Sequence, residues 1–184
     1  ATNAVALVPS SLTEGVAFDL LRYYRQKQQD DRAAALLRYQ SANTAHAALW
    51  ARERMILARR AFEKNDFKTA YQLAATHPFT TGPEMADAEW FAGWIATTRL
   101  QQPGKGFVHF ERMYKNVKTA QSTARAAYWA GVAADQSGQH KAATAWYGLA
   151  ARHMHTFYGQ LSAYALGNPE VYYQRFFQQT TPEA

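Results

Sequence analysis

The sequence lacks cysteine and is poor in the residues that interrupt helices. Its 184 residues include 10 glycines, 6 prolines and no cysteine. Without a thiol, the chain has no disulfide framework, no cysteine nucleophile and no thiolate metal site. No apolar run approaches the roughly 18 residues that a membrane-spanning helix needs, and no stretch alternates polar and apolar residues as a half-buried strand does. These absences favour an all-α protein that folds without cross-links.

Alanine, glutamine and aromatic residues dominate what is present. There are 36 alanines and 14 glutamines, and both residue types are strong helix formers. Aromatic residues make up 14% of the chain, with 5 tryptophans and 11 tyrosines. Small alanines beside large rings indicate helices that approach closely, with the rings filling the gaps between them.

The net charge is positive, with 20 Lys and Arg against 14 Asp and Glu, a formal balance of +6. A basic surface favours an anionic partner, such as nucleic acid, an acidic membrane or a cell-wall polymer that carries carboxylates. Charge alone does not choose among these partners.

Capping and turn residues divide the chain into about ten helices. Ser11, Asp66 and Ser122 stand at N-cap positions, Asp30 can cap the second helix, and Gly138 and Gly167 are stop signals. The helices are expected over residues 11–28, 31–38, 45–64, 67–76, 84–100, 105–115, 122–137, 139–152, 157–166 and 169–178.

The helices form pairs that resemble one another. The turn at Asn65 and the turn at Gly138 are 73 residues apart, and Gly93 and Gly131 are 38 apart. A period in the mid-thirties with small residues at the helix contacts is typical of a tetratricopeptide-like helical-hairpin superhelix, an α-solenoid. A globular helix bundle is the alternative. We expect one domain over residues 1–184, with an N-terminal extension over 1–10, helical repeats over 11–167 and a C-terminal helix over 168–184. The stacked hairpins should place four alanines where helices touch: Ala92, Ala96, Ala130 and Ala134.

The carboxylates and histidines do not predict a catalytic or metal site. Asp30, Asp66 and Glu84 stand at helix starts, where the helix dipole favours a negative charge. Glu53 and Glu89 lie within helices among cations, and no two carboxylates point to a shared pocket. The only histidine cluster is at residues 153–155, where positions i and i+2 do not share a helix face. The sequence therefore predicts no catalytic residue, no metal and no cofactor.

Arginines concentrate on the third expected helix. The functional interpretation is a groove for an anionic polymer, with Arg52, Arg59 and Arg60 as candidate contacts. The alternative is a solvated helix surface on which Arg52 or Arg54 holds a neighbouring hairpin. Tyrosine and tryptophan beside arginine can stack on sugars or bases, but the helical spacing of the rings favours core packing.

Several segments together resemble the superhelical region of soluble lytic murein transglycosylases. They lie at residues 15–31, 50–54, 89–96, 122–131, 145–147 and 156–161, ahead of Leu166-Gly167. The order and spacing match over about residues 13–167. The residues that match the family's architectural motifs are Trp90, Gly93, Trp94, Tyr128, Trp129, Gly131, Phe157, Tyr158 and Gly159.

This resemblance implies a periplasmic enzyme of peptidoglycan, in which a ring-like α-superhelix stands beside a lysozyme-like catalytic domain. Such enzymes cleave the MurNAc–GlcNAc bond without water and leave a 1,6-anhydro-muramyl end. The family's general acid/base is a glutamate followed by serine, and none of the eight glutamates in this chain is followed by serine. No catalytic residue is therefore carried over.

The resemblance thus predicts a non-catalytic domain that positions peptidoglycan, or protein partners, for a catalytic domain outside these residues. The first residues carry neither an initiator methionine nor a signal-peptide pattern, so we expect a processed protein or a piece of a longer one. A helical-repeat adaptor for protein partners is the alternative function. Nucleic-acid binding rests on charge alone and is not predicted.

Overall fold

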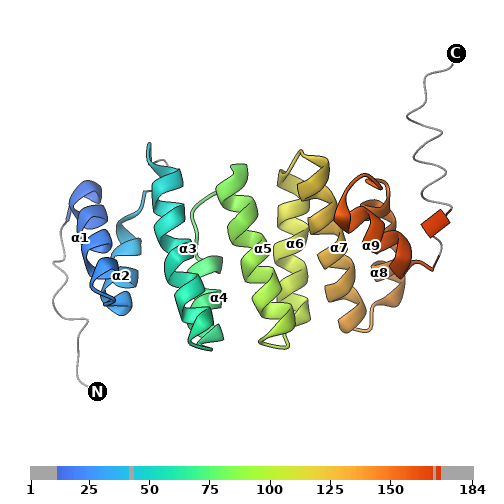
Figure 1. Cartoon of the computed structure of the whole chain (residues 1–184), viewed down its shortest axis with the longest axis horizontal. Helices are drawn as coiled ribbons and strands as arrows, with labels where there is room; N and C mark the ends of the chain where they lie inside the picture. Colours follow the sequence, from blue (N-terminus) through green and yellow to red (C-terminus); the bar gives the residue numbers. More distant parts are fainter. Residues whose placement is uncertain (1–11, 42–43, 168, 171–184) are drawn as a thin grey trace, which may run out of the picture. The chain divides into compact units, whose positions relative to one another are not determined.

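The computed structural model of the chain describes residues 12–41, 44–167 and 169–170 (Figure 1). Over these residues the secondary structure is helical, without a strand. The predicted extension over 1–10 and the predicted last helix beyond residue 170 lie outside the described residues, whereas Pro169 and Glu170 are helical. The elements are α1 (Glu14–Gln26), α2 (Asp30–Ala35), the 3-10 helix η2 (Leu36–Tyr39), α3 (Ala47–Glu63), α4 (Phe67–Ala75), α5 (Gly82–Thr98), α6 (Pro103–Asn116), α7 (Ala120–Gln136), α8 (His140–Ala151) and α9 (Phe157–Ala165).

The chain divides into two compact units, residues 1–88 and residues 89–184, and the division falls within α5. In the first unit α1 packs against α2 and α3 packs against α4. In the second unit α6, α7 and α8 each pack against the next helix in the sequence, and α9 also packs against α7. Neighbours in sequence are thus neighbours in space, and the expected all-α, tetratricopeptide-like array of helical hairpins is confirmed.

A residue in the left-handed conformation closes each of four successive hairpins. Gln28, Asn65, Gln101 and Gly138 have φ angles of 57°, 60°, 53° and 73°, and they follow one another at intervals of 37, 36 and 37 residues. The second helix of each hairpin begins two residues later, at Asp30, Phe67, Pro103 and His140. The backbone therefore repeats with the mid-thirties period that the sequence predicts.

The same backbone hydrogen bond accompanies each turn. The N–H of the residue after the left-handed position donates to a carbonyl in the last turn of the preceding helix, as in a Schellman motif. The bond from Asp66 to Ala61 and the bond from Gln139 to Ala134 are both 2.9 Å long. In the α5–α6 hairpin the bond from Gln102 reaches one residue further back, to Ala96 at 2.8 Å. These bonds satisfy carbonyls that a helix end leaves without a partner.

Opposite substitutions at two of these turns are expected to have opposite effects. Gly138→Ala should lower the free energy of unfolding by about 1 kcal/mol, because a Cβ disfavours the left-handed region. Gln101→Gly should raise it by about 0.5 kcal/mol, because that penalty is removed at a modest entropic cost. Urea denaturation of the two variants checks both values. Shifts of the same sign would contradict this interpretation of the turns.

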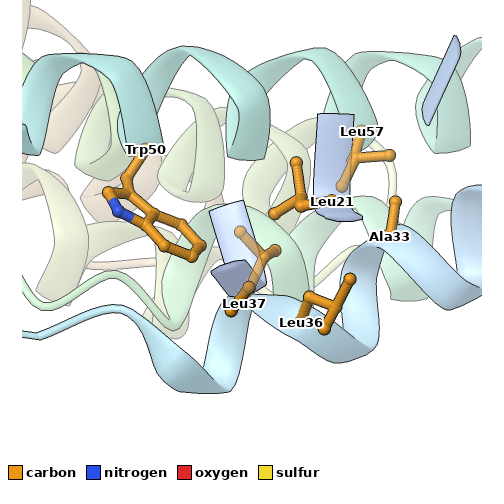
Figure 2. Packing of buried hydrophobic residues seen from close by; sticks show 7 residues of the cluster. Leu21, Ala33, Leu36, Leu37, Trp50 and Leu57 are labelled. Carbon is orange, nitrogen blue, oxygen red and sulfur yellow. The ribbon is translucent and has the colours of Figure 1, made fainter. Parts of the chain in front are cut away.

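The core of the first unit lies between α1, the α2–η2 segment and α3. Leu21, Leu36 and Leu57 are fully buried, and Trp50 is 1% exposed. Figure 2 shows Trp50 and Leu57 reaching from α3 toward the leucines of the α2–η2 segment. The ring of Phe18 packs against the indole of Trp50 with centroids 5.1 Å apart. This packing fixes α3, the helix that carries the candidate arginines.

Glycines in the second unit allow aromatic rings to approach a neighbouring helix. A Cβ on Gly93 would lie 2.7 Å from the Phe110 ring, and a Cβ on Gly131 would lie 2.7 Å from the Tyr147 ring. Phe110 and Tyr147 are 37 residues apart, so the same contact recurs in successive hairpins. The alanines predicted at helix contacts are buried as expected: Ala92, Ala96, Ala130 and Ala134.

The other residues of the architectural motifs also pack, with one exception. Trp90, Trp94 and Trp129 are partly buried against the cluster around Phe110. Tyr128 contacts the rings of Tyr147 and Tyr158, with centroids 5.8 Å and 5.4 Å away. The exception is Phe157, whose side chain is 63% exposed.

Two of the predicted N-caps are wrong by two or three residues. The N-cap of α1 is Thr13 rather than Ser11, and the N-cap of α7 is Thr119, which accepts a hydrogen bond from the Ser122 N–H at 3.3 Å. Asp66 caps α4 as predicted, accepting from the Thr69 N–H at 3.1 Å. Asp30 is the first residue of α2 rather than its cap.

Candidate functional site

Two of the three candidate arginines line the same hollow in the first unit. Arg52 and Arg59 are seven residues apart on α3, which is about two helical turns, so they project from one face. Both side chains are exposed. The hollow has a volume of about 410 Å³ and lies between α3 and the first turns of α5.

Small and apolar residues of α3 shape this hollow between the arginines. Ala48 and Ala51 leave space because their side chains end at a methyl group, and Met55 and Ile56 are half-buried. The opposite side is formed by Pro83, Glu84 and Asp87 of α5. The hollow therefore combines an apolar surface with two cations on α3 and two carboxylates on α5. We call it the α3–α5 groove.

Most charged groups of the groove form no ion pair with the described residues. Among the residues that the structure describes, Arg52, Arg59 and Glu84 have no oppositely charged partner within 4.0 Å. Asp87 differs from these three residues because it already interacts with another group. Three of the four charged groups can therefore meet a ligand without first breaking an ion pair.

Arg60 lies outside the α3–α5 groove. It donates hydrogen bonds to Asp30 at 2.8 Å and to the Arg25 carbonyl oxygen at 3.0 Å. Lys64 also donates to Asp30, at 3.0 Å. Burial would raise the pKa of Asp30, but the hydrogen bonds and positive charges of Lys64 and Arg60 outweigh it and lower that pKa below its ordinary value. Arg60 thus joins α3 to the start of α2.

The lowered pKa of Asp30 predicts an acid-sensitive contribution to stability. A carboxyl whose pKa is lower in the folded state stabilises the fold above its unfolded pKa of about 4, and this contribution is lost as the pH falls through the folded pKa. Asp30→Asn should cost about 1 kcal/mol at pH 7 and almost nothing below the folded pKa, because the pair is partly solvated. Thermal denaturation at a series of pH values from 7 down to 2 measures how this cost declines. Asp31→Asn, at the exposed next position, is the control and should show a smaller loss at pH 7.

Arg54 takes the structural role that the sequence left open between Arg52 and Arg54. It is only 4% exposed, and burial lowers its pKa to about 10, so the guanidinium stays charged at neutral pH. It donates to the Leu73 carbonyl oxygen at 3.3 Å, to the Thr76 hydroxyl at 3.3 Å and to the Gln40 side-chain oxygen at 3.0 Å. Arg54 therefore holds the end of α4 and the segment before α3.

A buried carboxylate in the second unit was not anticipated from the sequence. Glu89 is fully buried. It lies 2.6 Å from Nδ1 of His109 and 2.9 Å from Nη1 of Arg112, both on α6. The available signal was the place of Glu89 directly before the apolar residues 90–96 of α5, because a carboxylate in such surroundings is buried only when it is paired. Since solvent does not reach Glu89, its contacts hold α6 on α5 rather than form an open site.

Neither a metal site nor a membrane span is found in the described part of the chain. Over residues 12–41, 44–167 and 169–170, no group of three or more His, Asp or Glu side chains could hold a metal ion. No helix in these ranges has the length and hydropathy that crossing a bilayer requires. The α3–α5 groove is the candidate site because it brings two exposed arginines of α3 and two carboxylates of α5 around one hollow.

Comparison of this chain with protein-family models, with curated proteins and with solved structures finds no match.

Proposed function

We propose that this chain is the non-catalytic superhelical domain of a periplasmic peptidoglycan lytic transglycosylase. In this role it positions peptidoglycan strands, or protein partners, for cleavage of the MurNAc–GlcNAc bond by a catalytic domain outside these residues. The observation that carries the proposal is that Arg52 and Arg59 line one groove and have no partner of opposite charge among the described residues. A polymer bearing carboxylates is the complementary ligand. The sequence resemblance over about residues 13–167 supplies the identity of that polymer.

Binding to purified sacculi tests this proposal. Arg52→Ala/Arg59→Ala should weaken retention of the chain on sacculi about tenfold at low salt, because each arginine contributes roughly 0.7 kcal/mol to an exposed ionic contact. Lys118→Ala/Lys141→Ala is the matched control, since it removes the same charge from exposed positions of the second unit. Equal retention of both variants would contradict the role of the groove.

Two further outcomes distinguish the alternatives. Release of anhydro-muropeptides from the sacculi by this chain alone would contradict the non-catalytic assignment. No release and no retention would favour a helical-repeat adaptor for proteins, for which the exposed rings of Phe157 and Tyr164 on α9 offer apolar contact surface.

A further inference from the structure

The α3–α5 groove carries charges of both signs on opposite sides. Arg52 and Arg59 come from α3, whereas Glu84 and Asp87 come from α5. A ligand with only negative charge would meet the arginines favourably and the carboxylates unfavourably. A ligand with only positive charge would do the reverse. The arrangement therefore favours a ligand that presents both charges close together.

The size of the groove limits the ligand to a small group. A volume of about 410 Å³ accommodates a side chain or a short peptide end rather than a polymer backbone. The half-buried Met55 and Ile56 lie between the two arginines along α3, so they offer an apolar surface to a methylene chain. A carboxylate, an ammonium group and a short alkyl chain together match the three parts of the groove.

Other anionic polymers match less well. A phosphate backbone would bring negative charge beside Glu84 and Asp87 without an ammonium group to compensate. A peptidoglycan glycan without its peptides presents free lactyl carboxylates, which again bring negative charge without an ammonium group. In peptidoglycan the charged groups belong to the peptide stems, and an uncrosslinked diamino acid carries an amine and a carboxylate on the same carbon.

Resting on the proposed function, we infer that the α3–α5 groove binds the free amino-carboxylate end of an uncrosslinked diamino acid in a peptidoglycan stem. Arg52 and Arg59 bind the carboxylate, Glu84 binds the ammonium group, and Met55 and Ile56 contact the alkyl chain. Cross-linking converts the amine to an amide and removes its charge. The groove therefore distinguishes uncrosslinked stems from cross-linked ones.

A synthetic tripeptide tests this inference with the full chain. The probe is L-alanyl-γ-D-glutamyl-meso-diaminopimelic acid, and its two analogues carry an acetylated side-chain amine or an amidated side-chain carboxylate. We expect isothermal titration calorimetry to show that each analogue binds at least fivefold more weakly than the tripeptide, because each lacks one charged contact. Equal binding of the acetylated analogue would overturn the inference.

Two variants assign the contacts. Glu84→Gln should bind the tripeptide and its acetylated analogue about equally, since the partner of the amine is lost while the arginines remain. Arg52→Ala/Arg59→Ala should lose the preference for the free carboxylate. All three side chains line the groove and none belongs to the core cluster around Trp50, and circular dichroism confirms that each variant is folded. Unchanged selectivity in either variant would overturn the assignment.

The inference and the proposed function fail in different ways. Retention on sacculi that depends on Arg52 and Arg59, without measurable binding of the tripeptide, would overturn the inference and leave the proposed function standing. Loss of both sacculus retention and tripeptide binding in the unmodified chain would overturn both.

Discussion

Replacing Gly159 with alanine is expected to destabilise the packing of α9 on the end of α8 by about 3 kcal/mol. A Cβ at this position would overlap the carbonyl group of His153 and lie 3.1 Å from the Met154 nitrogen. These are backbone atoms, so a side-chain rotation cannot relieve the overlap. Thr156 ties the same place together, because its hydroxyl donates to the His153 carbonyl at 2.8 Å and accepts from the Gly159 N–H at 3.1 Å.

Hydrogen exchange over α9, together with urea denaturation of the whole chain, measures this effect. Gly148→Ala is the matched control, because nothing lies within 4 Å of a Cβ built on this helical glycine. The control should be stabilised by up to about 1 kcal/mol, since alanine has the higher helix propensity. If the amides of α9 exchanged as slowly in Gly159→Ala as in the unmodified chain, the inferred close contact between α9 and the His153 backbone would be wrong.

Glu89→Ala is expected to cost about 3–4 kcal/mol, because it removes the acceptor from a buried, hydrogen-bonded network. His109, only 7% exposed, would lose its partner at Nδ1, and Arg112 would lose its contact with the carboxylate. Glu89→Gln keeps an acceptor oxygen in the same volume and should therefore cost less than Glu89→Ala.

Glu111→Ala provides the control for the buried carboxylate. Glu111 pairs with Lys115 one turn away at 3.0 Å on the surface of α6, and such a pair contributes about 0.3–0.5 kcal/mol. Denaturant midpoints of the three glutamate variants give the comparison. A loss for Glu89→Ala no larger than that for Glu111→Ala would show that the buried network does not stabilise the second unit.

The helices could be predicted from the sequence more readily than their ends and turns. Asn65 and Gly138 were recognisable because asparagine and glycine enter the left-handed region easily. Gln28 and Gln101 occupy the same position in their hairpins, but glutamine gives no such signal, so the packing of the hairpin determines the backbone there. The cap of α1 was misplaced because Ser11 and Thr13 both precede Glu14 within capping distance.

The candidate site was predictable in part. The spacing of Arg52 and Arg59 is a helical repeat, so their common face follows from the sequence. The ion pair between Arg60 and Asp30 joins residues 30 positions apart, and no local pattern signals such a contact. The carboxylates that line the groove could not be predicted from the sequence either. The position of Glu84 at a helix start already accounts for a negative charge there.

Because the left-handed turns are almost evenly spaced, the backbone of one hairpin can replace that of the next. The side chains that pack between hairpins differ, so they cannot be exchanged in the same way. Excision of residues 66–101 would join Asn65 to Gln102 and would preserve the turn followed by the second helix. In the shortened chain α3 would face α6, and Ala58 stands where α5 has Gly93. Its methyl group would then meet the Phe110 ring, which requires glycine opposite it. A duplication or loss of one repeat is therefore compatible with this fold only when the glycine and its ring are inherited together.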